Sequence, residues 1–139
     1  MTNVIVDASV ILACAISDGK ARRTLLAASN IEFYSPEFVL EEVRRSLPKV
    51  IALSGVSPAI LSTLLDDVFS RVAVVPRVAF ADALPEARSL TARADAAGDE
   101  DYVALALKLR APVWTYDKDF HRIPKIRVIG RRQIELDSV

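Results

Sequence analysis

The stretch Val4-Ile5-Val6-Asp7 decides the fold class, together with the apolar segment 9–16 that follows it. Three β-branched residues in a row predict a buried strand. The segment 9–16 is apolar nearly all round, which is typical of a buried helix. A strand that leads at once into a buried helix is the opening of an α/β fold, and an acid, Asp7, stands at the junction.

The same alternation of strand and helix continues along the chain. A second helix is expected after a break at Asp18-Gly19, and Ser35-Pro36 and Ser57-Pro58 both read as helix starts, because serine caps free amides and proline fits the first turn. The predicted strands are 4–6, 31–34, 72–75, 113–115 and 126–129, and the predicted helices are 9–16, 20–28, 36–47, 58–70, 82–93 and 102–109. Parallel strands need crossover helices, so we expect a three-layer α/β/α fold around a mostly parallel sheet of about five strands.

Composition indicates a single folded unit. The chain has 139 residues, 52% hydrophobic and 26% charged, and no linker or repeat divides it, so one domain is expected over residues 1–139. Eighteen basic residues balance eighteen acidic ones, so affinity for a polyanion would have to come from local patches. The absence of a basic leader or of an apolar run of roughly 18 residues predicts a cytoplasmic protein with no membrane span. Cys14 lies in an apolar run and is expected to be a buried thiol.

Acidic residues fall where ligands bind in parallel sheets, just past the carboxyl ends of strands. Asp7 ends the first strand, Asp117 follows the strand 113–115, and Asp119 comes two residues later. Glu42 lies at the edge of the apolar stripe of the helix 36–47, and Asp99 precedes the helix 102–109.

Such a cluster of carboxylates has a chemical consequence. Several negative charges in a low-dielectric pocket repel one another, so the cluster usually needs a cation, and oxygen ligands favour Mg²⁺ or Mn²⁺. Mg²⁺ typically binds one or two carboxylates plus substrate phosphates, which points to phosphodiester hydrolysis by an activated water. The sequence has one histidine and lacks zinc-type Cys/His spacing, a GxSxG elbow and a phosphate-binding P-loop, so the usual competing chemistries are disfavoured.

Four segments, in order and spacing, resemble PIN-domain nucleases across nearly the whole chain: Val6-Asp7-Ala8-Ser9, Leu40-Glu41-Glu42-Val43, the run DEDYVALA at 99–106, and the run TYDKDF at 115–120. The resemblance implies that the metal-binding and catalytic acids are Asp7, Glu42, Asp99 and Asp117. It also implies that Asp119 assists or binds a second metal, and that Ser9 and Thr115 form hydrogen bonds within the site. For function it implies an Mg²⁺- or Mn²⁺-dependent endoribonuclease acting on RNA. Many small members are dimeric toxins of toxin–antitoxin pairs that a short antitoxin protein inhibits, so a homodimer and an antitoxin partner are expected.

The sequence leaves alternatives open at two of the candidate acids and for the function of the protein. Glu41 neighbours Glu42, which is preferred because it immediately precedes an apolar helical residue; Asp101 competes with Asp99, which has the family's spacing to Ala104. A non-catalytic module that holds a cation or a basic partner in an acidic pocket is the main alternative function. A phosphoacceptor signalling domain is another, although Asp7 lacks the adjacent acid that such domains carry at the first strand.

Overall fold

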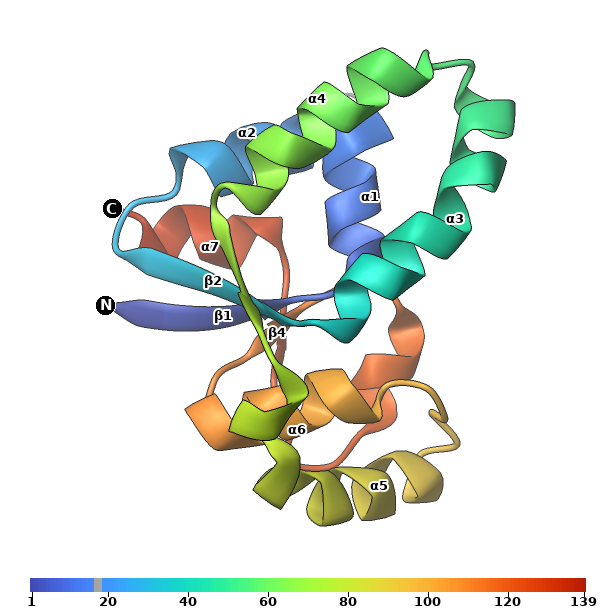
Figure 1. Cartoon of the computed structure of the whole chain (residues 1–139). Helices are drawn as coiled ribbons and strands as arrows, with labels where there is room; N and C mark the ends of the chain where they lie inside the picture. Colours follow the sequence, from blue (N-terminus) through green and yellow to red (C-terminus); the bar gives the residue numbers. More distant parts are fainter. Residues whose placement is uncertain (17–18) are drawn as a thin grey trace.

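A sheet of five parallel strands forms the centre of the computed structural model, which describes residues 1–16 and 19–139 (Figure 1). The strands are β1 (Thr2–Val6), β2 (Ile31–Pro36), β3 (Val72–Val75), β4 (Val113–Trp114) and β5 (Val128–Ile129). Their order across the sheet is β3-β2-β1-β4-β5, and every neighbouring pair is parallel. β1 therefore lies in the middle, where both faces are covered, as its β-branched sequence predicts.

Seven α-helices among the described residues cover the two faces of this sheet and make the predicted three-layer α/β/α fold. They are α1 (Ala8–Ile16), α2 (Lys20–Ala27), α3 (Phe38–Ser54), α4 (Pro58–Phe69), α5 (Leu84–Arg93), α6 (Glu100–Leu109) and α7 (Arg131–Asp137). In Figure 1, α1, α2, α4 and α7 lie on one side of the sheet and α5 and α6 on the other. Three short 3₁₀ turns, η1 (Arg77–Ala79), η2 (Ala81–Ala83) and η3 (Lys118–Arg122), complete the connections. Among the helices of the described residues, none combines the length and the apolar character that a membrane-spanning segment needs.

The core contains the largest side chains of the central strands and of α6. Trp114 and Phe33, from β4 and β2, are both buried, with ring centroids 6.0 Å apart. Cys14 is fully buried as a free thiol, as expected from its apolar surroundings in the sequence. This packing fixes the ends of β1 and β4, from which the first candidate acids project.

The prediction that Ser35-Pro36 begins a helix is wrong. Both residues belong to β2, where they pair with Val74 and Val75 of β3, and α3 begins only at Phe38. The Ser35 hydroxyl donates to the Val6 carbonyl at 2.8 Å instead of capping a helix. Pairing in a buried sheet satisfies more backbone groups than one cap can, so tertiary context overrides the local signal.

Other element boundaries also differ from the sequence prediction. α3 continues seven residues beyond position 47, through Pro48 to Ser54, and α5 starts at Leu84 rather than Asp82, which lies in η2. α7 was not predicted, because its sequence RRQIELD is strongly polar and its helix buries only Ile134. Part of the predicted break at Asp18-Gly19 lies outside the described residues, since these do not include Asp18.

Candidate active site

A pocket of about 320 Å³ brings together carboxylates from four separate segments of the chain. Asp7 follows β1, Glu42 lies in α3, Asp99 precedes α6 and Asp117 follows β4. The pocket is completed by Ala8, Ser9, Leu12, Arg45 and Ser46. The four predicted catalytic acids thus line one hollow, although up to 110 residues of sequence separate them.

Asp7 is the most buried of these acids, with only 6% of its surface exposed. Its Oδ2 accepts hydrogen bonds from Thr115 Oγ1 at 2.6 Å and from Ser9 Oγ at 2.8 Å. Burial raises the pKa of Asp7 above its ordinary value, while the bonds from Thr115 and Ser9 oppose that rise. The contacts predicted for Ser9 and Thr115 are therefore present, and they fix one oxygen of Asp7.

Glu42 is half-buried and has a partner that the sequence did not suggest. The hydroxyl of Tyr102, on α6, donates to Glu42 Oε1. Desolvation raises the pKa of Glu42, the bond from Tyr102 counteracts it, and the nearby charge of Asp7 adds to the rise.

Asp99 shows the strongest electrostatic effect in the pocket. It occupies the position before α6, but its side chain makes no capping hydrogen bond there. Burial raises its pKa from 3.8 to about 7, and the charges of Asp7, Asp117, Glu42 and Asp119 add to this rise. The carboxylate is therefore not explained by helix capping, and it experiences the combined field of the other acids.

Asp117 and Asp119 behave differently from each other. Asp117 lines the pocket, and its Oδ1 accepts from the Asp119 backbone amide at 2.9 Å, which closes the turn η3. The Asp117 amide in turn donates to Thr115 Oγ1 at 2.9 Å. Asp119 is not among the residues that line the pocket; its side chain is 48% exposed and pairs with Arg122 at 2.7 Å.

The two acids left as alternatives face other partners. Glu41 is exposed and lies 3.8 Å from Arg45 on the surface of α3. Asp101 lies 3.6 Å from the Arg77 guanidinium. Neither lines the pocket, so the geometry favours Glu42 and Asp99 over their neighbours.

The donor set suits a hard divalent cation, because it consists of carboxylates and hydroxyls and its acids repel one another. In the described part of the chain, no three His, Cys, Asp or Glu side chains stand close enough together to hold one ion among them. Mg²⁺ commonly binds through one or two carboxylates and keeps several waters. The lining of the pocket is thus compatible with a divalent cation held directly by one or two of its acids.

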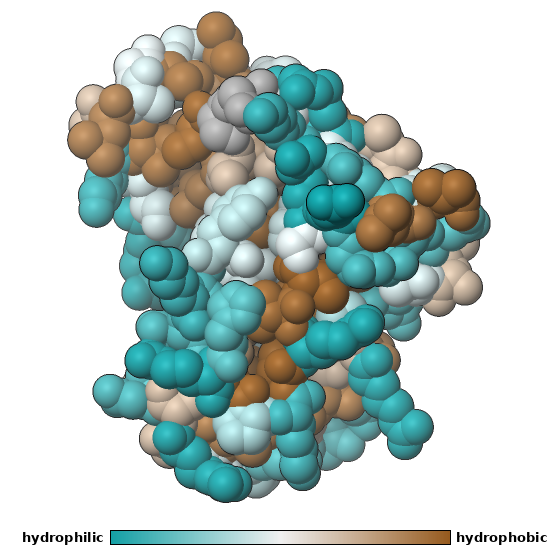
Figure 2. All heavy atoms as spheres, turned by 180° about the vertical axis from the view of Figure 1, so that it is seen from behind, coloured by the Kyte–Doolittle hydropathy of each residue, from teal (hydrophilic) through white to brown (hydrophobic). Residues whose placement is uncertain are grey.

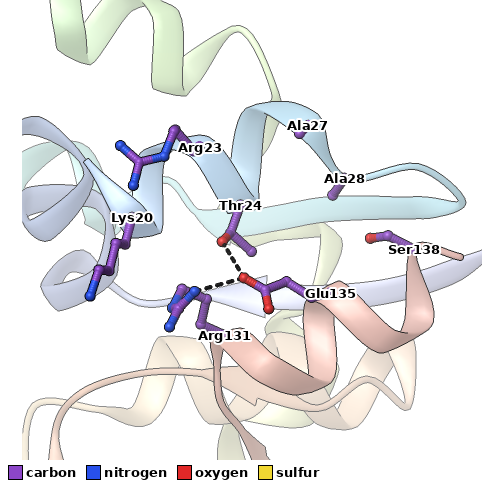
Figure 3. Close-up of a pocket in the computed structure, with 8 residues that line it drawn as sticks. All are labelled: Lys20, Arg23, Thr24, Ala27, Ala28, Arg131, Glu135 and Ser138. Atoms are coloured by element: carbon purple, nitrogen blue, oxygen red, sulfur yellow. Dashed lines mark hydrogen bonds and ion pairs between the residues drawn. The ribbon is translucent and has the colours of Figure 1, made fainter. Parts of the chain in front are cut away.

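A second hollow lies between α2 and α7, and its lining argues for a packing role (Figure 3). Glu135 accepts there from Thr24 Oγ1 at 3.1 Å and from Arg131 Nη1 at 2.7 Å. The bond from Thr24 joins α2 to α7, while Arg131 pairs with Glu135 within α7. Unlike the acidic pocket, this hollow presents no group of carboxylates to a ligand.

Sequence reasoning missed Tyr102 as a site residue. A tyrosine within the apolar segment 102–107 was an available signal, since a buried hydroxyl requires a hydrogen-bond partner. The identity of that partner depends on how α3 packs near α6, which no local pattern reveals.

Comparison with known proteins places this geometry in context. A family model described as a PIN domain matches residues 5–132. The fold is similar to a chain of the crystal structure of VapBC2 from Rickettsia felis bound to a promoter DNA fragment. The TM-score is 0.70 and the sequence identity is 18%, over 93% of this chain and 98% of that one. The fold is also similar to a DNA-bound VapBC from Salmonella typhimurium, with a TM-score of 0.69 and 20% identity over 94% and 99% of the two chains. PAE2754 from Pyrobaculum aerophilum gives a TM-score of 0.71 and 18% identity over 98% and 89%. No curated protein matches the sequence.

Proposed function

Since this chain belongs to the PIN domain family of nucleases, we propose that it is an endoribonuclease that uses Mg²⁺ or Mn²⁺ to hydrolyse RNA phosphodiester bonds. The proposed catalytic and metal-binding acids are Asp7, Glu42, Asp99 and Asp117. Asp119 is proposed as an accessory metal ligand that acts after its ion pair with Arg122 opens.

The main support for this proposal is that four acids lie in one pocket although their mutual repulsion destabilises the folded protein. Burial raises the pKa of Asp7, Glu42 and Asp99, and for each of them at least one other acid of the pocket contributes to the rise. Several carboxylates without a positively charged partner in one site are destabilising, and a divalent cation would relieve their repulsion. A structural role alone gives no reason to gather them.

The residues of the pocket have separable tasks under this proposal. A bound cation would supply charge neutralisation of the phosphate and an activated water for in-line attack on phosphorus. Thr115 and Ser9 hold Asp7 in one orientation through bonds to its Oδ2, so that its carboxylate would be positioned to help hold the cation. Arg45 lies at the rim of the same pocket and carries a charge that attracts a phosphate.

The test is an incubation of the purified protein with labelled RNAs and single-stranded DNA, in Mg²⁺, in Mn²⁺ and in chelator. Asp7→Asn is the active-site variant, and Asp66→Asn on the exposed surface of α4 is the control. Cleavage of RNA that requires both the cation and Asp7, and that survives in Asp66→Asn, would support the proposal. Cleavage that persists in chelator or in Asp7→Asn would contradict it.

We further propose that the protein is a cytoplasmic, homodimeric toxin inhibited by an antitoxin protein. The similarity in fold to two VapBC proteins supports this, and so does an apolar groove beside the acidic pocket, lined by Leu12, Ile16, Val50 and Leu53. Hydrophobic side chains gather at one upper corner of the molecule in Figure 2, and Leu53 is 78% exposed. Expression of the wild type alone should arrest growth, and expression of Asp7→Asn should not. Light scattering of the purified protein should give twice the mass of one chain.

A further inference from the structure

Tyr102 is a fully buried side chain whose hydroxyl contacts Glu42, one of the acids that line the pocket. Its ring packs edge-on against Phe120 of η3, with centroids 6.2 Å apart and an interplanar angle of 83°. Its hydroxyl donates to Oε1 of Glu42, which is 60 residues away in sequence. The tyrosine thus connects α6 with α3 and with the turn after β4.

The direction of this hydrogen bond follows from the two groups that form it. A carboxylate oxygen offers only acceptor sites, and the tyrosine hydroxyl has a proton to donate. Glu42 therefore accepts, and within the described residues Tyr102 is the only hydrogen-bond partner of that carboxylate. Tyr102 thus holds one oxygen of a carboxylate that also lines the acidic pocket.

Tyr102 also connects the positions of three acids. It follows Asp99 by three residues, within the first turn of α6, and Phe120 follows Asp117 by the same number of residues in η3. The hydroxyl bond to Glu42 and the ring contact with Phe120 therefore relate the segments of Glu42, Asp99 and Asp117 to one another.

We propose that Tyr102 is a positioning residue of the active site, which holds the Glu42 carboxylate in register with Asp99 and Asp117 through the hydrogen bond to Oε1. This rests on the proposed function, because the acids must act together on a cation and a phosphate for their register to matter. Partners that orient metal-binding carboxylates typically contribute 10- to 100-fold to metal affinity or activity.

The test compares Tyr102→Phe, which removes only the hydroxyl, with Tyr34→Phe as a matched control. Tyr34 also donates to a glutamate, Glu32 Oε2, at 2.6 Å, but on the exposed part of β2 and away from the pocket. Calorimetric titration with Mg²⁺ should give a dissociation constant about 10-fold higher for Tyr102→Phe, and kcat on RNA should fall about 10-fold with KM changed less than about threefold. Tyr34→Phe should match the wild type in all three quantities.

A second comparison separates positioning from a general packing role. In a Glu42→Gln background, Tyr102→Phe should cause little further loss of Mg²⁺ affinity or kcat, because the group on which it acts is already altered. Melting curves without Mg²⁺ establish that each variant is folded. Equal losses from Tyr102→Phe in both backgrounds, or wild-type values in Tyr102→Phe, would overturn the positioning role while leaving the nuclease function in place. A wild type that neither binds Mg²⁺ nor cleaves RNA would overturn the proposed function, and the positioning role with it.

Discussion

Replacing Asp99 with asparagine should stabilise the protein in the absence of divalent cations, although it removes a proposed catalytic group. The carboxylate is half-buried and faces the charges of Asp7, Asp117, Glu42 and Asp119, which together with burial raise its pKa to about 7. Asparagine has nearly the same shape but carries no charge to desolvate. It is also an equally good residue before a helix, so α6 should be unaffected.

The magnitude follows from the pKa. A rise from 3.8 to about 7 sets a ceiling of about 4 kcal/mol at pH 8, since each pKa unit corresponds to about 1.36 kcal/mol. Because Asp99 is only half-buried, solvent screening lowers the expected gain in unfolding free energy to about 1–2 kcal/mol. For a chain of this size, that gain corresponds to a melting temperature about 3–7 °C higher.

The pH dependence has a definite sign. Below about pH 4 the carboxyl group is neutral in both the folded and the unfolded protein, so wild type and Asp99→Asn should be equally stable. Between pH 4 and 7 only the unfolded state releases the proton, so wild-type stability should fall with rising pH while the variant lacks this contribution. Above about pH 7 the difference should reach its plateau.

The assay is thermal unfolding in chelator from pH 4 to 8, followed by circular dichroism, with Asp66→Asn on the exposed surface of α4 as the control. The control should stay within about 0.5 kcal/mol of the wild type at every pH. A variant less stable than the wild type at pH 8, or an equal gain at pH 4 and pH 8, would refute the electrostatic reasoning. Added Mg²⁺ should stabilise the wild type more than Asp99→Asn, because the cation offsets the same repulsion.

Three further outcomes are expected. Thr115→Val keeps the side-chain shape but removes both the 2.6 Å hydrogen bond to Asp7 and the acceptor of the Asp117 amide, so RNA cleavage should fall about 10- to 100-fold; an unchanged rate would show that the Thr115 hydroxyl does not orient these acids. Ser35→Ala should cost about 1 kcal/mol in a urea melt, because the Val6 carbonyl loses a buried donor; no change would mean that another donor satisfies it. Cys14 is buried and its pKa is raised to about 12, so a thiol reagent at pH 8 should react only after unfolding; fast labelling of the native protein would contradict the packing of α1.

Much of the fold could be predicted from local sequence patterns. The β-branched run that ends at Asp7, repeated in weaker form along the chain, predicted parallel strands and crossover helices, and the sheet has that arrangement. These features follow from side-chain shape and hydrophobic period, which act over a few residues. Local patterns gave the wrong element where a segment pairs with residues far away in the sequence. Ser35-Pro36 is a good helix start by its sequence, yet both residues pair with β3 in the sheet.

Part of the candidate site could likewise be predicted from local sequence, and part of it could not. The acids that follow β1 and β4 were recognisable from the sequence, and they were expected to lie close together because the carboxyl ends of parallel strands meet at one edge. The apolar stripe of α3 already favoured Glu42 over Glu41, since adjacent residues on a helix differ by about 100° in direction, and the structure shows Glu42 lining the pocket. That the Glu42 carboxylate accepts a hydrogen bond from Tyr102 became evident only in the folded protein. This pairing joins residues of α3 and α6 that lie 60 positions apart in the chain, and no pattern within a single segment encodes it.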